Sequence, residues 1–138
     1  MIIKTIKTLP ILLIATMVVS CTPAFADSWG NTHIDHINPL TINAGETAQI
    51  TAQLWLSNGM WDNPGAWRTL RFIIKDDVGN ELLNKKEETS WPKGEASVKI
   101  KLDTPGTYYV TVTYSGNSGQ DLDACRTNTT ITVKSKTA

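Results

Sequence analysis

The chain has 138 residues, 41% of them hydrophobic, and it carries 13 basic and 13 acidic side chains. This size accommodates one globular domain and excludes a multidomain enzyme. The balanced charge gives no basic surface for nucleic acid and no acidic tail, so nucleic acid is not expected as a partner. Five tryptophans are many for so short a chain, and they are the main indication of function.

The first 26 residues have the features of a secretory signal peptide. Two lysines precede an apolar segment over residues 9–20, and the Ala-Phe-Ala of residues 24–26 has the pattern of a cleavage site. We therefore expect residues 1–26 to be removed and residues 27–138 to form a domain that is secreted, periplasmic or at the cell surface. Alternatively, Cys21 is lipidated at a lipobox over residues 18–21. No segment reaches the roughly 20 apolar residues of a membrane span.

Cys125 is the one cysteine that follows the predicted cleavage site, so no disulfide can form within the mature domain. Neither a histidine nor a lysine lies next to it to favour the reactive thiolate. We therefore expect Cys125 to be buried as a small hydrophobic residue, with a reactive thiol or an intermolecular disulfide as the alternatives.

Hydrophobic and polar residues alternate with a period of two through most of the mature chain, which predicts half-buried antiparallel strands. Glycine, proline and asparagine separate these segments and predict turns. The strands are centred near residues 35, 41, 52, 72, 84, 98, 110 and 130. About seven strands in some 105 residues predict an all-β sandwich of two sheets.

A tight turn at residues 104–106 is followed by Tyr108, which is the setting of a tyrosine corner, and Val110 stands where an antibody domain has its second cysteine. With this motif the sequence resembles the bacterial immunoglobulin-like domains, often tandem repeats, of bacterial and archaeal surface and secreted proteins. The resemblance implies an immunoglobulin-like antiparallel β-sandwich and a spacer, stalk or adhesion module rather than an enzyme. It covers residues 34–134 and is carried by residues 38–47, 72–79, 94–98, 104–116 and 130–133.

Three tryptophans lie in segments that connect predicted strands. Trp61 and Trp67 precede the strand at residues 70–74, and Trp91 precedes the strand at residues 96–102. Such loops gather at one end of an immunoglobulin sandwich. We expect an aromatic platform there, suited to a sugar ring or an apolar peptide side chain. The other residues expected at this end are Trp29, Asp62, Asn63, Asp121 and Asp123.

A packing role is the alternative for the same tryptophans. Trp67 lies three residues before Leu70 and fits the core tryptophan common in such sandwiches, while Trp61 and Trp91 would cap the open end of a small core. Trp55 faces away from the apolar side of its strand and would cover the sheet.

Two groups of residues raise the question of a metal site. In His33-Ile34-Asp35-His36, the side chain of His36 would point away from the other two, so zinc would need ligands from elsewhere. Asp62, Asp121 and Asp123 could offer oxygen atoms to calcium, although the sequence has no EF-hand loop. No metal, cofactor or catalytic residue is predicted, because no nucleophile with a base and no phosphate-binding glycine loop is found in the sequence.

These features predict a non-enzymatic binding or adhesion module that contacts a glycan or a protein through its tryptophan-bearing loops. The alternative is a structural protein of the cell envelope, anchored at Cys21 and assembled with a partner through its edge strands. The charged run at residues 85–88 is typical of an edge strand that is protected from unwanted pairing.

Overall fold

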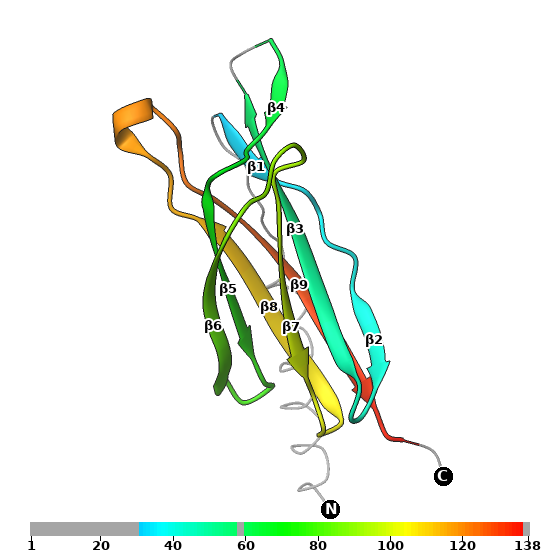
Figure 1. Cartoon of the computed structure of the whole chain (residues 1–138). Helices are drawn as coiled ribbons and strands as arrows, with labels where there is room; N and C mark the ends of the chain where they lie inside the picture. Colours follow the sequence, from blue (N-terminus) through cyan, green and yellow to red (C-terminus); the bar gives the residue numbers. More distant parts are fainter. Residues whose placement is uncertain (1–30, 58–59, 137–138) are drawn as a thin grey trace, which may run out of the picture.

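The computed structural model describes residues 31–57 and 60–136, which form two β-sheets packed face to face (Figure 1). The predicted signal peptide, Cys21 and Trp29 lie outside the described residues. In the described part, no helix is long and apolar enough to cross a bilayer.

The first sheet is organised around the long strand β3 (Thr47–Ser57). One edge of β3 pairs with β1 (Thr32–Ile34). The other edge pairs first with β7 (Glu95–Lys101) and then, beyond residue 54, with the short strand β4 (Asp62–Pro64). Two separate segments of the chain therefore share one edge of β3.

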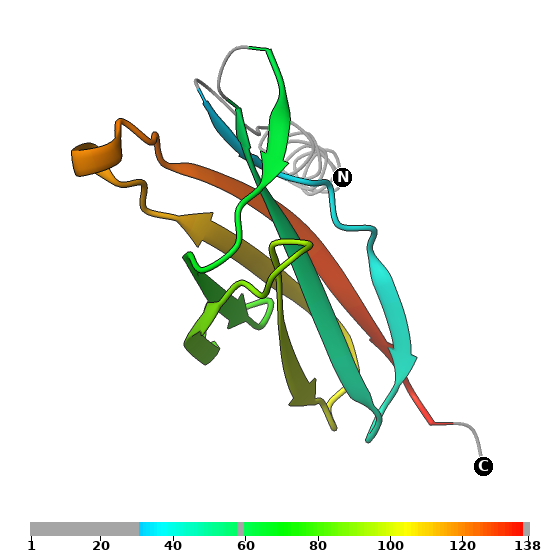
Figure 2. The ribbon, with the colours of Figure 1, turned by 45° about the horizontal axis from the view of Figure 1, so that its top comes forward.

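The second sheet has five strands in the order β2-β9-β8-β5-β6. All of its pairs are antiparallel except that of β2 with β9, which is parallel and is the exception to the antiparallel pairing that the alternation predicted. The cause is that the chain leaves the first sheet after β1 and joins the second sheet without reversing direction, as Figure 2 shows. The bounds of the strands are β2 (Leu40–Asn43), β5 (Thr69–Lys75), β6 (Glu81–Glu88), β8 (Gly106–Tyr114) and β9 (Cys125–Lys134).

Alternation along the strands produces the core between the sheets. Every second residue of β3, β5, β7, β8 and β9 is buried for most of each strand. Cys125 is buried among them, as expected, at the position paired with Tyr114. The largest fully buried apolar side chains are Phe72, Ile50, Leu54, Leu70, Ile74, Ile131, Val110 and Val112.

The tyrosine corner is present at the start of β8. The hydroxyl of Tyr108 donates a hydrogen bond to the backbone carbonyl of Thr104, four residues upstream. Burial, followed by the nearby charges of Asp76, Asp77 and Asp103, raises the pKa of Tyr108 above its ordinary value. With the strand order above, this corner confirms the expected immunoglobulin-like β-sandwich.

Strand β6 is the edge strand that its charged run predicted. Lys85 and Glu87 are paired in register with Phe72 and Leu70, so they occupy the core-facing side of an open edge, where they form an ion pair of 2.9 Å. Inward-pointing charges of this kind oppose the addition of a further strand.

Candidate functional site

Three connecting segments lie at one end of the sandwich, the upper end in Figure 1. They lead from β3 to β5, from β6 to β7, and from β8 to β9 through the 3₁₀ turn η1 (Ser118–Gln120). The hairpin of β3 and β4 projects farthest, and the segment around η1 stands apart from it in both views (Figures 1 and 2).

Large apolar side chains are exposed at this end. Trp61, Trp67 and Trp91 are 65%, 66% and 69% exposed, and Met60 is 81% exposed. We call these four residues the tryptophan end. The core interpretation of Trp67 is therefore wrong, and the buried cluster between the sheets does not include Trp61 or Trp91. A capping role for those two stays a prediction.

Buried Thr89 links the two segments that carry Trp67 and Trp91. Its hydroxyl donates to the carbonyl of Gly65 and accepts the N–H of Arg68 at 2.9 Å. Its own N–H donates to the carbonyl of Arg68 at 2.7 Å, and its carbonyl accepts the N–H of Trp67 at 2.9 Å. Trp91 follows two residues later, so one hydrogen-bonded junction fixes both segments.

Two glycines allow these segments to share the edge of β3. The N–H of Leu54 donates to the carbonyl of Gly94, and the carbonyl of Leu54 accepts the N–H of Gly65. A Cβ on Gly94 would lie 2.7 Å from the nitrogen of Gly65, and a Cβ on Gly65 would lie 2.8 Å from the side chain of Leu54. The backbones approach so closely that a side chain at either position has no room.

Trp67 adopts a left-handed backbone conformation, with φ of 62°. This region is unfavourable for a bulky residue and is taken without cost by glycine. The indole is exposed, so packing does not compensate for this cost. A strained, exposed aromatic residue on a fixed junction is the kind of outlier that occurs at contact sites.

Asp62 and Asn63 are exposed on β4, where they pair with Ser57 and Leu56 of β3. They directly follow Trp61 in the chain and thus lie on the projecting hairpin. Asp62 and Asn63 therefore place polar side chains beside Trp61 on this hairpin.

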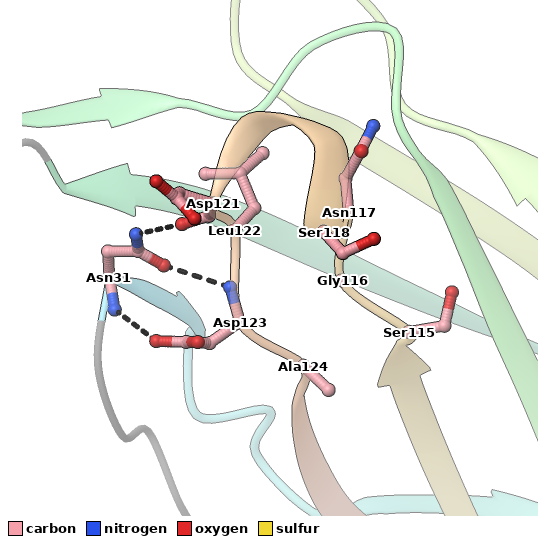
Figure 3. Close-up of a pocket in the computed structure, with 9 residues that line it drawn as sticks. All are labelled: Asn31, Ser115, Gly116, Asn117, Ser118, Asp121, Leu122, Asp123 and Ala124. Carbon is pink, nitrogen blue, oxygen red and sulfur yellow. Dashed lines mark hydrogen bonds between the residues drawn. The ribbon is translucent and has the colours of Figure 1, made fainter.

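Asp121 and Asp123 have a different environment (Figure 3). The side chain of Asn31 donates to the carbonyl of Asp121 and accepts the N–H of Asp123 at 2.9 Å, while the carboxylate of Asp123 accepts the backbone N–H of Asn31 at 3.3 Å. The hydroxyl of Thr32 also donates to the carbonyl of Asp123. These bonds attach the loop between β8 and β9 to the start of β1, so a structural role accounts for Asp123.

The same loop borders an open polar hollow of about 750 Å³, shown in Figure 3. Asn31 was not singled out from the sequence, and it could not have been, because it lies 92 residues from Asp123. The residues that line the hollow are Asn31, Ser115, Gly116, Asn117, Ser118, Asp121, Leu122, Asp123 and Ala124.

His33 and Asp35 belong to a contact that holds β1 against β3. The imidazole of His33 stacks on Trp55, with ring centroids 6.3 Å apart, and lies 3.5 Å from the carboxylate of Asp35. The indole N–H of Trp55 donates to the same carboxylate at 2.9 Å. Trp55 thus covers the outer face of the sheet, as its place in the strand predicted.

No group of three or more histidine, cysteine, aspartate or glutamate side chains is placed to hold a metal ion within residues 31–57 and 60–136. The two histidines are close neighbours on or just after β1, and His36 is exposed. Across the described residues, the candidate site consists of exposed apolar and polar side chains at one end of the sandwich.

Comparisons with known proteins give likenesses of fold only. No family model and no curated protein matches the chain. Among solved structures, the immunoglobulin complex of titin M10 and obscurin-like 1 aligns over 79% of this chain and 100% of its own, with 12% identity and a TM-score of 0.44. A CARDB domain from Pyrococcus furiosus, in complex with di-metal ions, aligns over 77% and 93%, with 11% identity and a TM-score of 0.42.

A superoxide reductase (neelaredoxin) from Ignicoccus hospitalis aligns over 78% of this chain and 81% of its own, with 10% identity and a TM-score of 0.35. An immunoglobulin-like fold does not by itself specify a function. The features that distinguish this chain are those of its own surface.

Proposed function

We propose that this chain is a non-enzymatic binding module, secreted, periplasmic or at the cell surface, that contacts a glycan or a protein through its tryptophan end. The observation that carries the proposal is the exposure of Trp61, Trp67 and Trp91 by about two thirds each, at the same end of the sandwich. Aromatic anchors surrounded by polar groups are the usual centre of a contact surface.

The three indoles can supply a large part of a binding energy. An indole buries about 200 Å² when covered, so covering two thirds of it is worth about 3 kcal/mol at about 25 cal/mol per Å². Three such side chains give about 10 kcal/mol, which is comparable to the cost of association, so the polar contacts beside them set the affinity. The Thr89 junction lowers the cost of association, because it fixes the segments of Trp67 and Trp91 before binding.

Assembly through the edge strand β6 is less well supported. Lys85 and Glu87 place charges on the core-facing side of that edge, where an added strand would bury them. A ligand that binds at the tryptophan end does not have to bury Lys85 and Glu87.

The test is a screen of the purified protein on glycan and peptide arrays, followed by affinity measurements with each hit. W61A/W91A should weaken binding at least tenfold, since it removes two anchors. The matched control is Y109A, which removes a 50% exposed aromatic residue from the five-stranded sheet. Equal loss of binding in both variants, or none in W61A/W91A, would refute the proposal.

A further inference from the structure

A row of cationic side chains crosses the outward face of the five-stranded sheet. Arg71 of β5 is paired in register with Lys86 of β6 on one side and with Thr113 of β8 on the other. Thr113 is paired in turn with Arg126 of β9. Because directly opposed residues point to the same face, Lys86, Arg71, Thr113 and Arg126 form one row across four strands.

Part of this row lines a hollow of about 350 Å³ that is more enclosed than the one beside Asn31. The hollow is lined by Arg71 and Lys86 together with the hydroxyl residues Thr69, Thr113 and Ser115. Thr69 and Ser115 lie two residues beyond Arg71 and Thr113 toward the tryptophan end. Two cations and three hydroxyl groups therefore surround one concave site, and all of them can donate hydrogen bonds.

Neither cation has an ionic partner among the residues that the structure describes. Within the described residues, the ion pairs join His33 to Asp35, Lys85 to Glu87, and Lys101 to Asp103, so neither Arg71 nor Lys86 takes part in one. The guanidinium of Arg71 donates to the neutral amide oxygen of Asn84. Like charges placed directly opposite each other on neighbouring strands are destabilising, and an anion between them would remove that cost.

We infer that this hollow binds an oxyanion: a sulfate, phosphate or carboxylate group. Arg71 offers a planar pair of donors, Lys86 a mobile ammonium, and the hydroxyl groups of Thr69, Thr113 and Ser115 complete the set of donors. The site is on the sheet face, whereas the tryptophan end is formed by loops, so this inference stands whether or not the tryptophans bind a ligand.

Two further charged residues, Arg126 and Glu88, lie near the hollow but do not line it. Arg126 is two strands away from Arg71, about 10 Å at the usual strand spacing, so it attracts the anion without contacting it. Glu88 is paired with Thr69 on the same face, yet it neither lines the hollow nor pairs with Lys86. Removing Arg126 should weaken binding about twofold, and E88Q should strengthen it by a similar factor.

The experiment is an NMR titration of the isotope-labelled protein with sodium sulfate, sodium phosphate and sodium acetate in separate arms, each at ionic strength matched with sodium chloride. We expect saturable shifts of the amides of residues 69–71, 86 and 113–115. R71Q/K86Q should weaken binding at least tenfold, and the exposed single variant K86Q should weaken it severalfold. The arm with the tightest binding identifies the preferred oxyanion.

The matched control is K99Q/K134Q, which removes the same net charge from exposed lysines outside the hollow. It should bind like the wild type. Equal weakening in K99Q/K134Q and R71Q/K86Q would show attraction by net charge alone and overturn the inference. So would the absence of saturable shifts with all three anions.

Discussion

The two ends of the sandwich are built differently. At the end opposite the tryptophans, the connections are short turns whose polar groups bond locally. The carboxylate of Asp76 accepts the N–H groups of Val78 and Asn80, and the Tyr108 hydroxyl donates to the carbonyl of Thr104. In the described segments, these turns expose one large hydrophobic residue, Val78, against four at the tryptophan end.

Backbone conformation differs in the same way. We call the end opposite the tryptophans the turn end. Its residues with positive φ are all glycines, at positions 45, 79 and 106, whereas the tryptophan end has positive φ at two residues that are not glycine, Trp67 and Asp121. The turn end therefore has the features expected of a segment that serves stability alone. The tryptophan end includes strain and apolar exposure that stability does not explain, and such departures are expected where a surface has a function.

Glycine replacement should show the largest difference between the ends. G94A places a Cβ 2.7 Å from a backbone nitrogen at a φ of 71°, whereas G79A meets nothing within 4 Å at a φ of 92°. We expect G94A to lower the free energy of unfolding by about 3 kcal/mol and G79A by about 1 kcal/mol, measured by urea denaturation. Equal losses would mean that the close approach at β3 is absent.

The tyrosine corner gives a second effect, at the turn end. Y108F removes the hydrogen bond to Thr104 and should lower the free energy of unfolding by about 1 kcal/mol near neutral pH. Because the pKa of Tyr108 is raised in the folded state, its contribution is complete below about pH 10 and is lost as the pH rises through the raised pKa. Alkaline unfolding curves should therefore fall less steeply for Y108F, and an identical slope would contradict this.

Replacing Trp67 tests the strain at the tryptophan end directly. W67N introduces a residue that tolerates the left-handed region and should raise the free energy of unfolding by about 0.5 kcal/mol. The control is W67A, which removes the indole without relieving the strain. If W67N instead lowers stability by more than about 1 kcal/mol, the indole is packed.

The smallest effect is expected at Asp76. The backbone N–H of Asn80 has the largest influence and lowers the pKa of Asp76, whereas desolvation comes second and raises it. The hydrogen bonds from the Asn80 side chain and from the N–H groups of Val78 and Gly79 lower this pKa further. Its contribution is therefore complete above about pH 4 and is lost as the pH falls through the lowered pKa. Acid unfolding of D76N should show a shallower dependence on pH than that of the wild type, and a steeper one would be inconsistent with these bonds.

Much of the fold was predictable because alternation records which side of a strand is buried. The segments that became β3, β5, β7, β8 and β9 were found in this way, and the tyrosine corner was found from its turn. The alternation does not show which sheet an edge strand joins. In β6 the core-facing side carries Lys85 and Glu87, so its pattern gave no sign that it pairs with β5.

The candidate site was predictable only in part. The place of the tryptophans in connecting segments indicated one end of the sandwich, but the distance of Trp67 from Leu70 suited a buried residue equally well. Its exposure depends on a left-handed backbone fixed by Thr89, a contact between residues more than 20 apart. The oxyanion hollow depends on strand register, which aligns Arg71 with Lys86 and Thr113 and cannot be deduced from alternation alone.

The most direct test of a contact role for the tryptophan end is the free energy of unfolding of W61A/W67N/W91A, measured by urea denaturation beside the wild type. If these side chains are exposed for binding, the triple variant keeps its stability within about 1 kcal/mol and loses every array hit of the wild type. A loss of several kcal/mol would instead show that the tryptophans stabilise the domain, and would contradict the proposed function.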